Sequence, residues 1–154
     1  MLNQLIAMTK NQYYKLLLLV GISGSGKTTI LRQIAQKENY QYINLNYELS
    51  RQLIDFPGEE QNRLIEREVE AIINSSPKDT LLLDNIELIF AKDFNLNPLQ
   101  MLKSQSRKKT LIVGWNGEYD GRLLTFGRKG DDEYEEYNKN VLSEIYIVPI
   151  NELR

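Results

Sequence analysis

The segment "GISGSGKT", residues 21 to 28, combines glycines, a lysine and a hydroxyl residue at a spacing that suits phosphate binding. It matches the pattern G-x-x-x-x-G-K-[ST], in which backbone N–H groups surround the phosphate oxygens of a nucleotide. Gly21, Gly24 and Gly26 permit the tight turn that points these N–H groups inward. An apolar run precedes the pattern and a helical pattern follows it, as this chemistry requires. We therefore predict a phosphate-binding loop (P-loop) here.

The last two residues of the pattern have separate roles. Lys27 should reach the β- and γ-phosphates, and the Thr28 hydroxyl should coordinate Mg²⁺. We expect the nucleotide to be bound by Gly21, Ser23, Gly24, Ser25, Gly26, Lys27, Thr28 and Thr29. The tripeptide "NKN" at 138 to 140 lacks the Asp of the guanine-reading N-K-x-D motif, so the expected ligands are ATP and Mg²⁺. The alternative is a glycine-rich turn without a ligand, although a chance match is a rare event, roughly below one per cent.

Asp84 ends the apolar run "TLLLD", where P-loop proteins place a second magnesium-coordinating residue. Such a carboxylate usually acts through a water molecule on the metal. Aspartate is also common in turns and as a helix cap after a strand, which is the alternative role. Because the phosphate-binding loop lies upstream, we favour the metal role and predict Thr28 and Asp84 as the metal-site residues.

The residues after Asp84 bear on whether a bound nucleotide is hydrolysed. Many hydrolytic P-loop proteins have a glutamate next, but this chain has Asn85, whose amide can orient water but cannot accept its proton. Glu87 can act as the base if the chain turns immediately after the strand. Its alternative is a solvated position at the start of a helix, where a carboxylate suits the helix dipole. Phosphoryl transfer depends mostly on positioning and charge, so hydrolysis without a well-placed base is expected to be slow rather than absent.

Three further residues, which lie later in the chain, are also candidates for catalysis. Asn116 can sense the γ-phosphate if its strand lies beside the P-loop strand, and a turn residue in Asn-Gly is the alternative. Arg122 and Arg128 can act as arginine fingers supplied to a neighbouring subunit, and a solvated loop of mixed charge is the alternative. The predicted catalytic residues are Lys27, Asn85, Glu87, Asn116, Arg122 and Arg128.

Alternating strands and helices must position these residues. Apolar runs predict strands at 15–21, 40–46, 80–84, 109–115 and 143–150. Helical spacing predicts helices at 2–14 (with Tyr13 facing inward), 27–37, 58–74 and 98–106, whereas the polar, glycine-rich residues 116–140 show no clear pattern. This order predicts an α/β fold of three layers, one domain over residues 1–154, in which helices cover both faces of a mainly parallel sheet. Ligands of such sheets bind beyond the carboxyl ends of the strands.

Composition excludes several classes of chemistry. The 154 residues include 19 basic and 21 acidic ones, so the net charge of -2 gives no global attraction to DNA or to an anionic membrane, although a local patch is compatible with it. The absence of Cys and His removes disulfides, thiolate ligands and imidazole bases. The N-terminus has no secretory pattern and the apolar runs are too short to span a bilayer, so we expect a cytoplasmic protein.

The P-loop, "LLLDNIELIF" and "TLIVGWNGEYDGRLLTFGRKGDDEYEEY" together resemble the BrxF family, the small P-loop proteins of type 3 BREX bacteriophage-defence systems. The resemblance covers nearly the whole chain and implies an ATPase-like core that serves an anti-phage complex with other defence-system proteins. The chain is also similar to the additional-strand class of P-loop ATPases, which implies a five-stranded sheet of order 5-1-4-3-2. Asn85 stands where that class usually has Glu, and little chain follows the last strand to form a helical lid domain.

Three functions remain open on these grounds. The first is a nucleotide-dependent switch or assembly subunit, acting as a homo-oligomer or with defence-system partners. The second is a small-molecule kinase, although the sequence has no arginine-rich lid segment between its later strands. The third is a scaffold that binds nucleotide without turnover.

Overall fold

Five parallel strands form the centre of the protein, for which a computed structural model describes residues 1–153. They are β1 (Leu16–Gly21), β2 (Gln41–Asn44), β3 (Thr80–Asp84), β4 (Thr110–Tyr119) and β7 (Tyr146–Pro149). Their order across the sheet is β2-β3-β4-β1-β7, and each neighbouring pair is parallel. Read from the β7 edge and numbered along the chain, this is the order 5-1-4-3-2, so the predicted α/β fold and strand order are confirmed.

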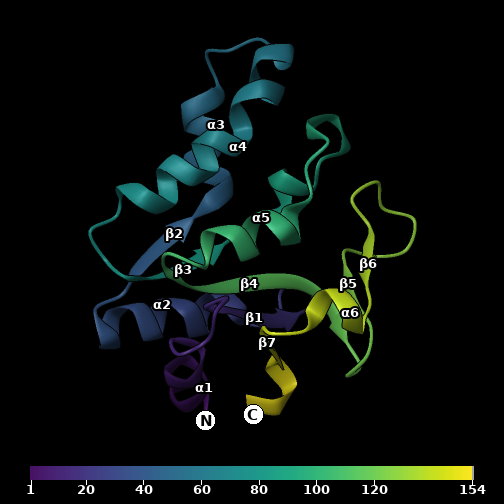
Figure 1. Ribbon diagram of the computed structural model, residues 1–154. Helices are drawn as coiled ribbons and strands as arrows, with labels where there is room; N and C mark the ends of the chain where they lie inside the picture. The colour runs from purple at the N-terminus through teal and green to yellow at the C-terminus, as the bar shows by residue number, and fades with distance from the viewer. Residues whose placement is uncertain (154) are drawn as a thin grey trace.

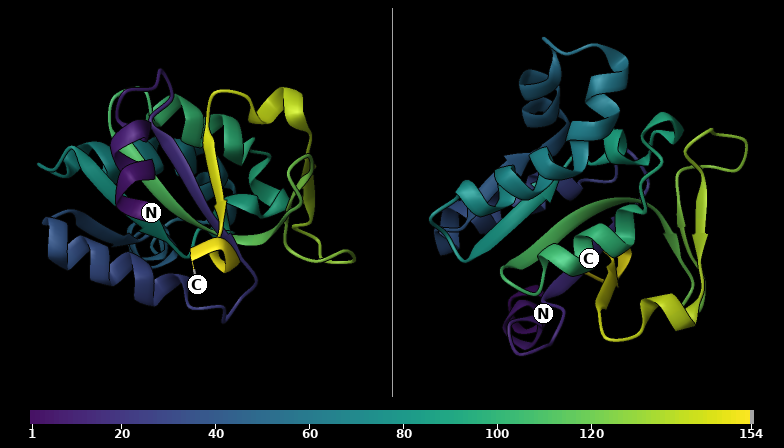
Figure 2. Two further views of the ribbon diagram at one scale, coloured as in Figure 1. Left: turned by 90° about the horizontal axis from the view of Figure 1, so that it is seen from below. Right: turned by 45° about the horizontal axis from the view of Figure 1, so that its top comes forward.

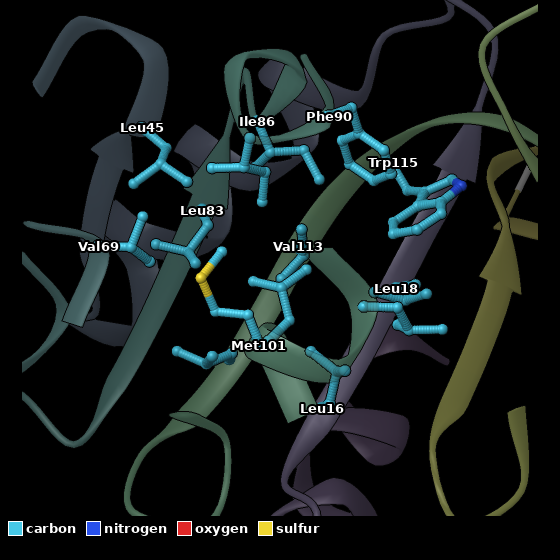
Figure 3. Close-up of a cluster of buried hydrophobic side chains, with 14 of the residues drawn as sticks. Leu16, Leu18, Leu45, Val69, Leu83, Ile86, Phe90, Met101, Val113 and Trp115 are labelled. Carbon is cyan, nitrogen blue, oxygen red and sulfur yellow. The ribbon is translucent and has the colours of Figure 1, made fainter. Parts of the chain in front are cut away.

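Helices cover both faces of this sheet (Figure 1). One face packs against α1 (Leu2–Thr9) and α2 (Lys27–Glu38), and the other packs against α3 (Leu45–Leu53), α4 (Gly58–Ser75) and α5 (Pro98–Gln105). Strand β1 supplies both cores, since its alternate residues point to opposite faces. Leu16, Leu18 and Val20 join the α3–α5 side, and Leu17 and Leu19 join the α1–α2 side. Figure 3 shows the larger core, in which Leu18 and Val113 of neighbouring strands belong to the same cluster as Met101 of α5.

The segment without a clear sequence pattern forms an antiparallel extension of β4. Strand β4 continues to Tyr119 and pairs with β5 (Leu124–Phe126), which pairs with β6 (Glu135–Tyr137), before the short α6 (Lys139–Leu142). This extension projects beside the parallel strands (Figure 2, right). Trp115 anchors it, because its ring is fully buried and its indole N–H donates to the carbonyl of Thr125 at 2.9 Å.

The first predicted helix is too long. Helix α1 ends at Thr9, and residues 10–14 form turns closed by the bonds from the N–H of Asn11 to the carbonyl of Met8 and from Gln12 to Thr9. The prediction that Tyr13 faces inward is therefore wrong, because this residue is 59% exposed. Asn and Thr have low helix propensity, and nothing beyond Thr9 offers an apolar face to extend the helix against the sheet.

The second predicted strand contained the start of a helix. Strand β2 has only four residues, and α3 begins at Leu45, where the Asn44 side chain accepts a hydrogen bond from the N–H of Tyr47 at 3.1 Å and caps the helix. The apolar residues Ile43 and Leu45 fit either a strand or a helix start, so spacing alone could not place the boundary. The last strand is likewise shorter than predicted, and β7 is followed by the short 3₁₀ helix η3 (Ile150–Leu153).

Candidate nucleotide-binding site

The glycine-rich loop lies where the sequence predicted, between the carboxyl end of β1 and the first turn of α2. Gly26 precedes α2 with φ of 101° and Gly24 has φ of 80°, conformations that strain any residue with a Cβ. The N–H groups of the first turn of α2 thus face the space above the sheet, together with the positive end of the helix dipole. This local geometry suits a phosphate group.

Lys27 lies folded back across this loop. Its side chain is 6% exposed, and its ammonium donates hydrogen bonds to the carbonyls of Gly21 and Ile22, both at 2.8 Å. Burial lowers the pKa of Lys27, and the nearby carboxylates of Asp84 and Glu87 offset part of this effect by favouring the charged form. The Lys27 ammonium is therefore held against the loop carbonyls and lies near two acids, Asp84 and Glu87.

Thr28 and Asp84 meet at the base of the loop, although 56 positions separate them in the sequence. The Thr28 hydroxyl donates to Oδ2 of Asp84 at 2.6 Å, and the Tyr42 hydroxyl donates to the same oxygen at 2.6 Å. Gly114 of β4 leaves room for this carboxylate, because a Cβ at that position would lie 2.9 Å from Oδ1 of Asp84. One hydroxyl and one carboxylate form the donor set that Mg²⁺ uses beside nucleotide phosphates, so these residues fit the ion.

The chain turns sharply after Asp84, as a catalytic role for Glu87 requires. Asn85 adopts a left-handed conformation with φ of 53°, and Glu87 then opens the 3₁₀ helix η1 (Glu87–Phe90). The amide of Asn46 donates to Oε2 of Glu87 at 2.9 Å, and the amide of Asn116 donates to Oε1. Two asparagines, Asn46 in the first turn of α3 and Asn116 on β4, thus fix the carboxylate in one orientation.

These residues surround one cavity of about 310 Å³. Its lining comprises Ser23, Gly24, Gly26, Lys27, Thr28, Asp84, Asn85, Glu87 and Asn116. All nine are among the residues predicted to bind the nucleotide, to hold the metal or to take part in catalysis. They include Asn85 and Asn116, for which the expected roles were positioning water and sensing the γ-phosphate. Asn116 is aligned with Gly21 in the parallel pairing of β4 with β1, which places its side chain next to the loop. The predicted residues Gly21, Ser25 and Thr29 belong to the loop and the first turn of α2 but not to this lining.

The two predicted arginines are in different places. Arg128 lines a second cavity of about 390 Å³, which shares Ser23, Glu87 and Asn116 with the first cavity. Arg122 lies in the exposed turn between β4 and β5, where its N–H donates to Oδ1 of Asp120 at 2.8 Å. Arg128 is therefore next to the nucleotide site of its own chain, and Arg122 is not.

Sequence reasoning missed Tyr42 and Asn46, which contact the two acids of the site. Tyr42 lies on β2, beside β3, and burial and its bond to Asp84 raise the pKa of its hydroxyl, so it remains a donor. Asn46 follows β2, and its Oδ1 also accepts a hydrogen bond from the N–H of Leu88 at 2.9 Å. The available signal was the topology, because carboxyl ends of adjacent parallel strands meet at one edge of the sheet.

None of the helices within residues 1–153 is long and apolar enough to cross a membrane. No curated protein matches the chain. The family model described as an AAA domain matches residues 13–114, which run from just before β1 into β4 and include the P-loop, Asp84 and Glu87. This match covers most of the chain and agrees with the P-loop and the strand order of the structure. The protein therefore belongs to the AAA domain family of P-loop NTPases.

Proposed function

We propose that this protein is an ATP- and Mg²⁺-binding switch subunit that hydrolyses ATP slowly by itself and faster when assembled. The observation that carries the proposal is the position of Glu87, which lines the same cavity as Lys27, Thr28 and Asp84 and is held there by two amides. A solvated surface glutamate would not have both carboxylate oxygens bound by side-chain amides from two other elements. This arrangement supports turnover rather than binding alone.

In the proposed reaction, Lys27 leaves the carbonyls of Gly21 and Ile22 and donates to the β- and γ-phosphate oxygens. Mg²⁺ held by Thr28 and, through water, by Asp84 would neutralise phosphate charge. Glu87 accepts a proton from a water molecule, the water oxygen bonds to the γ-phosphorus, and the bond to the β–γ bridging oxygen breaks to leave ADP. Each carboxylate oxygen of Glu87 can accept a hydrogen bond from that water beside its amide partner, so Asn46 and Asn116 orient the base without blocking it. The isolated site is slow because no second subunit contributes an arginine to it.

Assembly would supply what the single chain lacks. Arg122 is exposed on the β4–β5 turn and can reach a neighbouring copy or another partner, whereas Arg128 is beside its own nucleotide cavity. An arginine supplied in trans can raise the rate about 10³- to 10⁵-fold. We propose that the partners are further copies of this chain and other proteins of a type 3 BREX-like defence system, on the resemblance of the P-loop, Asp84 and β4–β6 segments.

The experiment that tests this function compares the molar mass of the protein by light scattering with and without ATP–Mg²⁺ or a non-hydrolysable analogue. We expect a larger species with the analogue and a turnover per chain that rises with protein concentration. A thermal melt in the same buffers adds a second measurement. A melting temperature that ATP–Mg²⁺ does not move would show that the protein does not bind the nucleotide, and the proposal would be wrong.

A small-molecule kinase is the second candidate, because the cavity beside the phosphate site could hold an acceptor. That cavity adjoins Glu87 and includes the apolar side chains of Ile22 and Phe126 as well as Arg128. In such a reaction Glu87 would deprotonate an acceptor hydroxyl instead of water. Incubation with γ-labelled ATP and a pool of metabolites separates the two, since label in an organic product supports the kinase and label only in inorganic phosphate supports the switch.

A further inference from the structure

The charges of this protein are distributed unevenly. Residues 10–15 and 103–109 hold six of the 19 basic residues and none of the 21 acidic ones. The rest of the chain therefore has 13 basic residues against 21 acidic ones. A net charge of -2 conceals one strongly positive region on an otherwise negative molecule.

The fold brings the two basic segments together. Residues 10–15 lead into β1, residues 106–109 lead into β4, and these strands are parallel neighbours. Lys15 joins the segments directly, since its ammonium donates to the carbonyl of Arg107 at 2.7 Å. The region lies at the amino ends of the strands, whereas the P-loop lies at the carboxyl ends, roughly 20 Å away for a strand of this length.

A cavity of about 520 Å³ opens in this region, and we call its lining the amino-edge patch. The patch consists of Gln12, Tyr13, Lys15, Ser104, Arg107 and Lys108. Its charged members are three cations, and no carboxylate belongs to it among the residues that the structure describes. A concave surface with only positive charge concentrates its field on an anion.

Aromatic rings accompany these cations. The guanidinium of Arg107 lies 4.8 Å from the ring centre of Tyr13, and the ring of Tyr14 meets Tyr13 edge-on at 4.8 Å. The ammonium of Lys103 lies 4.7 Å from the ring centre of Tyr14 and donates a hydrogen bond to the carbonyl of Val141. Tyr13 nevertheless remains 59% exposed, as a supported ring at the edge of a basic cavity.

We propose that the amino-edge patch binds single-stranded nucleic acid. Lys15, Arg107 and Lys108 would neutralise backbone phosphates, and Tyr13 would stack against a base. Cations alone would suit any polyanion, including an acidic peptide. The exposed, supported tyrosine favours nucleic acid, because a base offers a ring face and a glutamate side chain does not. This proposal is independent of the ATPase function, since the patch shares no residue with the nucleotide cavity.

Fluorescence anisotropy with a labelled oligothymidine at low salt tests the proposal. We expect binding that weakens with salt, with a slope of log affinity against log salt near -2, from about -0.7 for each of the three neutralised phosphates. Arg107→Glu with Lys108→Glu should reduce the affinity about tenfold or more. Tyr13→Ala should reduce it about fivefold or more without changing the salt slope.

The matched control is Lys92→Glu with Lys139→Glu, which makes the same charge change at exposed lysines outside the patch and should leave binding unchanged. Circular dichroism melts and ATP binding verify that each variant is folded. Equal loss in the control pair would indicate a global charge effect and overturn the proposal. Tighter binding to a labelled polyglutamate peptide than to oligothymidine would also overturn the proposal. The same holds if duplex DNA binds as tightly as oligothymidine and Tyr13→Ala does not change the affinity.

Discussion

The side-chain amide of Asn46 donates a hydrogen bond to Oε2 of Glu87 at 2.9 Å and accepts one from the N–H of Leu88 at 2.9 Å. Asn46 therefore fixes both the carboxylate and the backbone of the 3₁₀ turn that carries it. Because Asn46 follows β2 and lies in the first turn of α3, any movement of α3 would move the proposed base.

Replacing Glu87 by Gln should remove turnover but not ATP binding. The amide keeps the size of the side chain but cannot accept a proton, so we expect the hydrolysis rate to fall about 10²- to 10⁴-fold. Phosphate release measures this, and a nucleotide titration verifies the affinity. Glu70→Gln is the matched control: it makes the same chemical change at an exposed glutamate of α4, outside the cavity, and should retain turnover. An unchanged rate in Glu87→Gln would exclude Glu87 as the base.

Asn46→Ala tests a positioning role. We expect kcat to fall about fivefold or more while KM for ATP stays near its original value, because the substrate itself is not contacted. The double variant with Glu87→Gln should lose no more activity than Glu87→Gln alone, since both changes act on one group. Additive losses would show that Asn46 acts on stability and not through the carboxylate.

Lys27→Ala should abolish ATP binding without unfolding the chain. The ammonium is buried against loop carbonyls and packs little apolar surface, so its removal costs the fold little and the phosphates lose their direct cation. Calorimetric titration with ATP–Mg²⁺ measures the loss, and a thermal melt of the free protein verifies folding. A folded variant with normal affinity would contradict the phosphate role.

Asp84→Ala should weaken nucleotide binding mainly when magnesium is present. The carboxylate is expected to act through the ion, so the affinity for metal-free ATP should change far less than the affinity for ATP–Mg²⁺. Paired titrations with magnesium and with a chelator measure both. Thr28→Val serves as a companion variant, because it removes the hydroxyl that donates to Asp84 at 2.6 Å and should show the same metal-selective loss. An equal loss of ATP affinity with magnesium and with the chelator would indicate that Asp84 has a structural role, as a turn or helix cap, and does not act through the ion.

Turnover should climb more than linearly with protein concentration, and Arg122→Ala should remove that rise without changing ATP affinity. Mixing Arg122→Ala with Lys27→Ala should restore activity, because each copy supplies the group that the other lacks. Arg128→Ala should instead reduce the rate of the dilute protein, since Arg128 lies at the cavity of its own chain. Fast turnover by a dilute, demonstrably monomeric sample would show a site complete in one chain.

The P-loop, the buried strands and the position of Asp84 at the end of β3 followed from the sequence, because each depends on residues close together in the chain. Gly24, Gly26 and Lys27 define a loop whose geometry is local, and the apolar runs before it and before Asp84 are typical of buried strands, which the structure confirms. The 5-1-4-3-2 strand order came from the resemblance to a known class. The boundary at Leu45 and the end of α1 were wrong, since short apolar spacings fit more than one element.

Pairing between distant segments decided the rest. Asn46 and Tyr42 contact the two acids only because β2 lies beside β3. Arg128 lies at the cavity and Arg122 does not, because the chain after β4 folds back as β5 and β6. The exposed Tyr13 and the meeting of two basic segments likewise depend on β1 lying beside β4. Sequence spacing determines which side chains a strand or loop presents, but the sheet order determines which of them share a cavity.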